Sequence, residues 1–302
     1  MEYQTLLPIA NAVVHICKDT HQGTRFCNHN CLFCIENREI NVKPIVPSFA
    51  EISKVSDYIR SSLGQNIEIM VAGGEPSLHP DFEKIIQLFY ENFSSINLST
   101  KGCGRNDLIY SFIAQSIIKK CTVSLHSHDA TKYQQLTKSR SGDFFLVLRF
   151  LNEIKSLLGE LHINFVIVKQ NVSDMACFIE FIAKLFPMAT VHFYHYINTG
   201  NAYYNKDLFF NVFDFARCFT EAIDVTEKYK LKVLFRDVPF CIDERLQYYS
   251  EKISNNIIYS YRNDTGIICK KEKVTTHLLQ RCVKCDSAET CGGVISSNYA
   301  GK

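Results

Sequence analysis

Short apolar runs alternate along most of the chain with longer segments in which apolar residues recur every three or four positions. Six of the short runs are rich in β-branched and aromatic residues and predict strands at 12–17, 67–72, 96–100, 121–126, 163–168 and 190–196. Strands that alternate with helical segments are typical of parallel sheets with right-handed crossovers. The pattern therefore predicts an α/β fold, a partial (β/α)6 TIM-like barrel.

The helical segments and the C-terminal part of the chain indicate where helices begin and where the barrel ends. Ile52, Val55 and Ile59 recur on one helical face, and Ser48 and Glu51 before that face have the spacing of a capping box. After about residue 208 the rhythm changes to one long helix-like segment, followed by a stretch rich in cysteine and turn residues. We predict a barrel at 1–231 and a small C-terminal domain at 232–302. Since parallel barrels gather active-site residues at the C-terminal ends of their strands, chemistry is expected just after each strand.

Composition and net charge limit the classes of protein to which this chain can belong. Hydrophobic residues make up 46% and charged residues 21% of the 302 positions, which is ordinary globular usage, and the formal net charge is +2. So small a charge gives no sign of a surface for nucleic acid or an anionic membrane. The apolar stretch 6–17 has no basic leader and contains polar residues, so we expect no signal peptide or membrane span and a cytoplasmic location. In that reducing compartment metal binding is the leading explanation for clustered members of the 13 cysteines.

One cysteine cluster follows the first predicted strand. Cys27, Cys31 and Cys34 stand in the sequence CNHNCLFC. Three thiolates can hold a cubane of four irons and leave one iron open, whereas ferredoxin clusters use four cysteines. Zinc is the alternative, and it would require a fourth ligand such as His21 or His29. An open iron can bind a cofactor or a substrate.

This loop resembles that of the radical S-adenosylmethionine (SAM) superfamily, which has an aromatic residue, here Phe33, before its last cysteine. A second match is Gly73, Gly74 and Glu75 after the second predicted strand, in the place of the family's GGE motif for the methionine amino group of SAM. Two glycines permit close backbone approach, and Glu75 can accept hydrogen bonds from an ammonium group. The resemblance implies a [4Fe-4S] cluster on the three cysteines, with SAM bound to it.

Weaker positions also map onto cofactor contacts through this resemblance. They are Ser99 at the end of the third predicted strand, Ser124 and His126 at the end of the fourth, and Ile167 in the fifth, facing adenine. Serine at a strand end and isoleucine in a strand also have ordinary structural roles. In related peptide-modifying enzymes an arginine after the fourth strand binds the cofactor carboxylate, and Arg140 is the substitute that this chain offers.

A second cysteine cluster lies near the C-terminus. Cys282, Cys285 and Cys291 form CVKCDSAETC, which resembles part of the SPASM domain and of its shortened relative, the twitch domain. Both carry auxiliary [4Fe-4S] clusters behind radical SAM barrels. A full SPASM pattern has a further cysteine where Ile295 stands, so the resemblance implies one auxiliary cluster.

The auxiliary cluster requires a fourth ligand from upstream. Cys241 in DVPFC is favoured because it resembles a PxC element of twitch-type sequences, and Cys269 in IICKK is the alternative. A zinc site is the competing interpretation, since paired cysteines at this spacing bind zinc as readily as iron and sulfur.

The resemblance implies that the reduced cluster passes an electron to SAM and that the resulting 5'-deoxyadenosyl radical takes hydrogen from a substrate. A reductant such as flavodoxin or ferredoxin would be the partner. The SPASM-like C-terminus favours an oxidoreductase or maturase that modifies a ribosomally synthesised peptide. Dehydrogenation or rearrangement of a small-molecule metabolite is the alternative, and a non-catalytic iron-sulfur or zinc-binding protein is the alternative of another class.

Overall fold

A curved parallel sheet forms the centre of the computed structural model, which describes residues 12–17, 27–35, 46–250, 257–262, 266–271, 276–277, 282, 284–287, 291 and 293–295. Its parallel strands follow one another in chain order. They are β1 (Ala12–Cys17), β2 (Glu68–Gly73), β3 (Ser95–Thr100), β4 (Lys120–Ser124), β5 (Glu160–Ile167), β6 (Thr190–His195) and β7 (Lys232–Arg236). The α/β fold with a partial barrel is thus confirmed.

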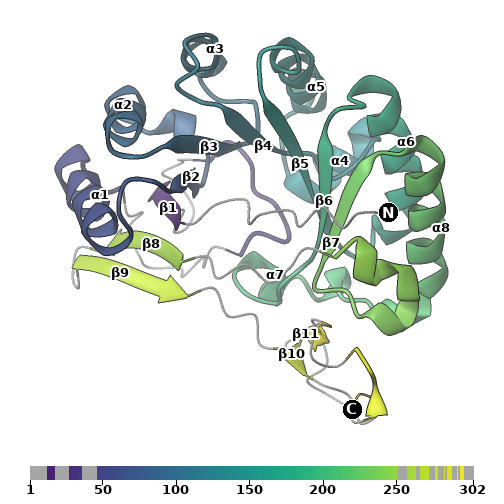
Figure 1. Cartoon of the computed structure of the whole chain (residues 1–302). Helices are drawn as coiled ribbons and strands as arrows, with labels where there is room; N and C mark the ends of the chain where they lie inside the picture. Colours follow the sequence, from purple (N-terminus) through teal and green to yellow (C-terminus); the bar gives the residue numbers. More distant parts are fainter. Residues whose placement is uncertain are drawn as a thin grey trace.

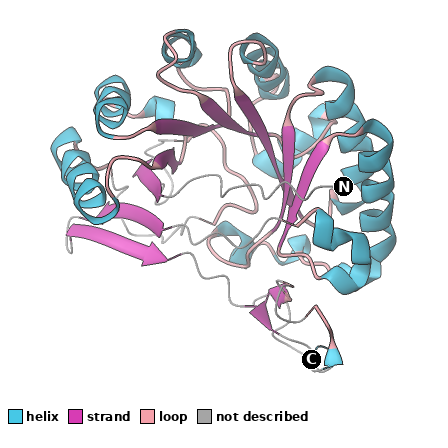
Figure 2. Ribbon diagram, viewed as in Figure 1, coloured by secondary structure: helices cyan, strands magenta, loops and turns pink. Residues whose placement is uncertain are grey.

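Helices α1, α2, α3, α5, α6 and α8 lie around the outside of the sheet (Figures 1 and 2). The helices are α1 (Phe49–Leu63), α2 (Phe82–Asn92), α3 (Asn106–Ala114), α4 (Ala130–Thr137), α5 (Asp143–Ile154), α6 (Met175–Leu185), α7 (Asn201–Tyr204) and α8 (Ala216–Tyr229). The predicted capping box is present at the start of α1, where Ser48 and Glu51 cap each other's backbone amides. Ile52, Val55 and Ile59 are buried as predicted.

The two faces of the sheet differ in chemistry because successive side chains along a strand point to opposite sides. The face toward the helices is apolar and fully buried, as shown by Ile69, Leu98, Val123, Ile163, Phe193 and Phe235. The other face, which we call the inner face, carries Asn97, Lys120 and Glu160 side by side in register. Further along the strands Ser124, Asn164 and His192 are also in register there. The inner face is therefore the side of the sheet that offers polar side chains for chemistry.

The segment 232–302 contributes strands to both edges of the sheet. Its first strand, β7, pairs in parallel with β6 and was absent from the six predicted strands. Its short apolar core, Val233 to Phe235, lies between Lys232 and Arg236, which hides the periodicity. Strand β8 (Ile257–Arg262) pairs in parallel with β1 at the other edge, and β9 (Gly266–Lys271) pairs antiparallel with β8. The proposed boundary at 231 and 232 therefore separates two neighbouring elements of the barrel, α8 and β7.

A separate two-stranded antiparallel sheet of β10 (Thr276–His277) and β11 (Val294–Ile295) lies near the second cysteine cluster in the chain (Figure 1). Among the described residues no helix has the length and apolar character to cross a membrane.

Candidate active site

The loop that carries the first three cysteines is fixed to the barrel by backbone hydrogen bonds. The amides of Asn30 and Leu32 donate to the carbonyls of Thr137 and Leu136 at the end of α4, over 2.8 Å and 2.9 Å. Cys27 and Cys31 are each 9% exposed, and Cys34 is half-buried. The loop therefore has a defined course although it contains no helix or strand.

Two asparagines, the first residue of α7 and the residue that follows the helix, hold the other side of this loop. The Asn201 side chain donates to the carbonyl of Cys31 over 2.8 Å, and its backbone amide donates to the carbonyl of Cys34 over 2.8 Å. Asn205, one turn later, donates to the carbonyl of Leu32 over 3.2 Å. Sequence analysis missed both asparagines. Their four-residue spacing places them on one helical face, but nothing in the sequence shows what that face contacts.

The three thiols lie within electrostatic reach of one another. Burial raises the pKa of Cys31, and the neighbouring Cys27 and Cys34 raise it further. Burial by itself lowers the pKa of Lys101, but the anionic forms of Cys27 and Glu75 outweigh it and the pKa is raised overall. Two buried thiols and the half-buried thiol of Cys34, beside a cation that favours thiolates, form a donor set that fits an iron-sulfur cluster. Lys101, which follows β3, is a site residue that sequence analysis did not assign.

Glu75 is fully buried, and both its oxygens are engaged by the protein. One oxygen accepts hydrogen bonds from the hydroxyls of Thr100 and Ser77, each over 2.8 Å, and the other accepts one from the Lys101 amide over 2.7 Å. Glu75 therefore ties the end of β2 to the end of β3. An ammonium-binding role for Glu75 stays a prediction.

The backbone carbonyl of Gly74 accepts a hydrogen bond from the ammonium group of Lys101. Gly73 and Gly74 have positive φ angles of 99° and 20°, which residues with a Cβ rarely adopt. The glycine pair thus leaves a backbone carbonyl that binds the primary ammonium group of Lys101.

His126 joins the cysteine loop to β5. Its ring packs edge-on against Phe33 with the ring centres 4.6 Å apart, and its Nδ1 accepts a hydrogen bond from the amide of Val166 over 3.1 Å. Burial lowers the pKa of His126 to about 3, with smaller contributions from His29 and Lys101. At neutral pH this side chain is uncharged and holds Phe33 in place.

The other residues predicted to contact the cofactor lie in different parts of the structure. Ser99 and Ser124 lie on the inner face, in line with Thr122 and Asn164 respectively. Ile167 is fully buried on the side of β5 that carries Ile163 and Phe165, so the structure places it in the core. Arg140 has an exposed side chain, and its backbone amide donates to Asp143 over 3.0 Å. Cofactor contacts by these residues stay predictions.

The sulfur of Cys291 lies beside the turn that carries Cys241, 50 positions earlier in the chain. Cys241 is exposed in a short turn that follows β7. The sulfur of Cys291 accepts hydrogen bonds from the amide of Phe240, next to Cys241, and from the amide of Gly293, each over 3.4 Å. The amide of Cys285 donates to the carbonyl of Cys282 over 3.1 Å, which makes this pair a tight turn.

The other candidate ligand is harder to place. Cys269 lies in β9, and its side chain is outside the described residues. The choice between Cys241 and Cys269 as the fourth auxiliary ligand stays a prediction, although the hydrogen bond of the Cys291 sulfur with the amide of Phe240, next to Cys241, favours Cys241.

The fold is a partial parallel barrel, and its loop of three thiols lies at the C-terminal ends of the strands. These two features are typical of barrel enzymes that hold a metal cluster beside their substrate. The profile of the Radical SAM superfamily matches residues 22–207, more than half of the chain, and the protein belongs to that superfamily. Membership implies a [4Fe-4S] cluster and SAM.

Sequence relatives include enzymes of two chemistries. The GTP 3',8-cyclase of Aquifex aeolicus (strain VF5) is 26% identical over 255 residues, which cover 82% of this chain and 72% of that protein. A probable GTP 3',8-cyclase of Sulfurisphaera tokodaii is 30% identical over 165 residues, 52% of this chain and 49% of that relative, so the match spans about half of it. The 7,8-dihydro-6-hydroxymethylpterin dimethyltransferase of Methanocaldococcus jannaschii matches 29% of the chain at 31% identity.

Solved structures share the fold over nearly the whole chain. Streptococcus suis SuiB bound to S-adenosylmethionine superposes with a TM-score of 0.64 at 13% identity, over 95% of this chain and 73% of that one. Native anSMEcpe with bound AdoMet gives 0.63 at 15% identity, over 93% and 88%. At these identities the likeness describes the fold alone.

Proposed function

We propose that this protein cleaves SAM reductively at the loop of Cys27, Cys31 and Cys34 and abstracts hydrogen from a bound substrate. A [4Fe-4S] cluster on these thiols would supply one electron to the SAM sulfonium and so generate the 5'-deoxyadenosyl radical. The observation that carries the proposal is the gathering of the three thiols, two of them buried, around the Lys101 ammonium, which also donates to the carbonyl of Gly74.

The residues of the chain have defined tasks in this proposal. The Gly74 carbonyl, which binds the Lys101 ammonium in this structure, is suited to the ammonium group of SAM. Binding of SAM there displaces Lys101. Glu75 keeps the Gly74 carbonyl in position because it ties β2 to β3 through Thr100. Asn201 keeps the thiol loop closed, since it holds the carbonyl of Cys31.

A ribosomally synthesised peptide is the proposed substrate. Support comes from the cysteine-rich C-terminal segment, where the Cys291 sulfur lies beside the residue that precedes Cys241. We propose one auxiliary [4Fe-4S] cluster on Cys241, Cys282, Cys285 and Cys291. In keeping with this, the fold resembles that of SuiB, a protein whose structure was also solved bound to the precursor peptide SuiA. A cytoplasmic reductant such as flavodoxin or ferredoxin would supply the electrons.

A small polar metabolite is the second candidate substrate, and a different observation favours it. The inner face presents Asn97, Asn164 and His192 in place of the branched apolar residues that fill most parallel barrels. The GTP 3',8-cyclase of Aquifex aeolicus, which matches 82% of this chain, points in the same direction.

Anaerobic reconstitution followed by dithionite reduction tests the proposal. About eight irons per chain and release of 5'-deoxyadenosine support two clusters and SAM cleavage. Bound zinc, or no 5'-deoxyadenosine, would support the non-catalytic alternative. Candidate precursor peptides and GTP are then added separately. Stimulation by GTP and by no peptide would remove the peptide as the substrate.

A further inference from the structure

A chain of ionisable side chains crosses the inner face of the sheet and has no task in the proposed SAM cleavage. Nδ1 of His162 on β5 lies 2.9 Å from Nε2 of His192 on β6. Nε2 of His162 lies 3.4 Å from a carboxylate oxygen of Glu160. His192, His162 and Glu160 therefore form a row of proton-carrying groups, and each lies within hydrogen-bonding distance of the next.

The outer end of this chain is in contact with water. The Glu160 side chain is 53% exposed, at the N-terminal end of β5. Its second carboxylate oxygen pairs with Lys120 over 3.1 Å, and Lys120 also pairs with Glu68 over 2.9 Å. This pairing fixes Glu160 while leaving one oxygen directed to His162. The carboxylate can thus exchange protons with solvent.

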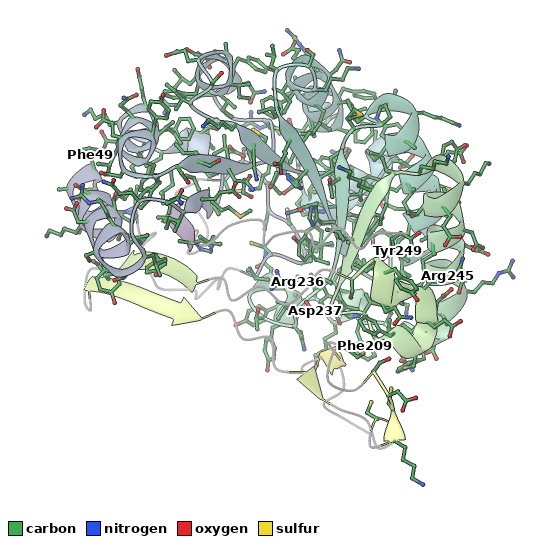
Figure 3. The ribbon with its side chains drawn as sticks, in the orientation of Figure 1. Phe49, Phe209, Arg236, Asp237, Arg245 and Tyr249 are labelled. Carbon is green, nitrogen blue, oxygen red and sulfur yellow. The ribbon has the colours of Figure 1, made fainter. Side chains whose placement is uncertain are left out.

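The inner end lies at the depth of the proposed cofactor site. His192 is 1% exposed. It is in register with Asn164, and Asn164 is in register with Ser124, the last residue of β4. Beyond it, Tyr194 stacks on the His192 ring with the ring centres 6.0 Å apart and the planes 10° apart. The guanidinium of Arg236, labelled in Figure 3 at the end of β7, lies 5.6 Å from the centre of the Tyr194 ring.

The charge states suit proton transfer. Burial lowers the pKa of His162, and the neighbouring His192 lowers it further, so His162 is neutral at pH 7. Burial tends to raise the pKa of Glu160, but its hydrogen bond with Lys120 prevails and the pKa is lowered, so the carboxylate is ionised. A neutral imidazole carries one N–H donor and one nitrogen acceptor, which is the arrangement that a relay requires.

We infer that Glu160, His162 and His192 form a proton relay between the interior of the barrel and water at the N-terminal end of the sheet. The relay serves a substrate that exchanges a proton during turnover, and in this its inner end rests on the proposed function. Nδ1 of His192 takes a proton from the substrate, and the Nε2 proton of His192 passes to Nδ1 of His162. The Nε2 proton of His162 passes to Glu160 and then to water. One proton leaves, and no electron moves.

Exchange of the imidazole N–H protons with water tests the relay without knowledge of the substrate. The reconstituted full-length enzyme, labelled with ¹⁵N-histidine, is examined by NMR at pH 7. His195 is the internal control, because it is buried and its Nδ1 contacts the carbonyl of Tyr196 outside this chain of groups. A buried N–H with no relay exchanges only when the fold opens locally.

Glu160→Gln and His162→Gln each interrupt the relay, since an amide does not pass a proton on. We expect either variant to slow exchange at His192 about tenfold or more, toward the rate of His195, which itself stays unchanged. Glu160→Gln alters a half-exposed side chain and keeps its shape, so the result does not depend on the folding of the His162 variant. A His192 exchange rate equal to that of the wild type in Glu160→Gln would overturn the relay.

Failure of the proposed function has a different signature. SAM cleavage with dithionite and no substrate is expected to be equal in the wild type and in Glu160→Gln, because Glu160 is remote in register from the thiol loop. A wild type that releases no 5'-deoxyadenosine contradicts the proposed function, while the exchange rates still decide the relay.

Discussion

The side chain of Asn201 donates a hydrogen bond over 2.8 Å to the carbonyl of Cys31, a residue 170 positions earlier in the chain. This bond joins α7 to the middle of the thiol loop. The loop is thereby held from two sides, by α7 and by the end of α4. The geometry of the thiol loop therefore depends on α7, a segment that lies outside the cysteine motif.

Asn201→Ala is expected to loosen the loop rather than unfold the protein. The variant loses the hydrogen bond to the Cys31 carbonyl and a longer one, over 3.4 Å, to Oδ1 of Asn30, about 1–2 kcal/mol together, while its backbone amide still donates to Cys34. We expect faster loss of iron to a chelator from the first cluster and an almost unchanged thermal midpoint. Asn211→Ala, at a half-buried asparagine bonded to Asp214 and Phe213 away from the thiol loop, is the matched control. Equal chelation rates in the two variants would contradict the prediction.

Gly104 and Ser77 pack so closely that a side chain at position 104 displaces the hydroxyl of Ser77. A Cβ at Gly104 would lie 1.9 Å from Oγ of Ser77, which bonds Glu75 over 2.8 Å. Gly104→Ala should therefore destabilise the protein by about 1–3 kcal/mol in urea unfolding, since Glu75 loses a partner in a buried site. In Gly104→Ala/Ser77→Ala the 1.9 Å clash with the hydroxyl is removed, and only the tight contacts with Cγ of Glu75 at 3.1 Å and Cβ of residue 77 at 3.2 Å remain, so we expect the two effects not to add. Strict additivity of the two single variants would disprove this contact.

Iron content separates the two candidate ligands of the auxiliary cluster. Cys241→Ala should lower the content from about eight irons to about four, because the Cys291 sulfur lies beside this turn. Cys269→Ala is the matched variant and should retain about eight. The reverse result assigns the fourth ligand to Cys269. In both variants the first cluster should still cleave SAM.

Acid stability is expected to depend on His195. Burial lowers its pKa from 6.5 to about 4. Between these two pH values the imidazole is protonated in the unfolded chain and neutral in the folded protein. The stabilisation is fully present above pH 6.5 and is lost as the pH falls toward 4. His195→Phe keeps a ring against Phe210 and should reduce the slope of unfolding free energy against pH in this range by about 1.4 kcal/mol per unit. Urea titrations between pH 4.5 and pH 7 measure the slope; an unchanged slope would assign the acid sensitivity to other groups.

Sequence patterns predicted those elements whose signals are local. The capping box at Ser48 and the helical face of Ile52 and Val55 depend on residues within one turn, and both are present. Six strands were predicted from apolar runs that face helices, because burial of that face is what the pattern encodes. Strand β7 was missed, since its three apolar residues stand between Lys232 and Arg236 and its identity depends on pairing with β6.

The sequence predicted only those site residues that belong to recognisable motifs. The thiols and the glycines of the GGE sequence carry chemistry in their residue types. Lys101 and Asn201 acquire their roles from distant partners, the Gly74 carbonyl and the Cys31 carbonyl. Glu75 shows the opposite case: the residue was identified, but its contacts are with Thr100 and Ser77, because a buried carboxylate takes the donors that the fold supplies.

The pairing of β8 with β1 has a consequence for synthesis of the chain. Ala12 to Val14 find their partners at Ile257 to Tyr259, so one edge of β1 has no strand beside it until most of the protein has been translated. At typical translation rates this interval is on the order of tens of seconds. An unpaired edge of that kind can pair with other chains. Newly made protein is therefore most exposed to aggregation, and most in need of chaperones, in the period before residue 259 leaves the ribosome.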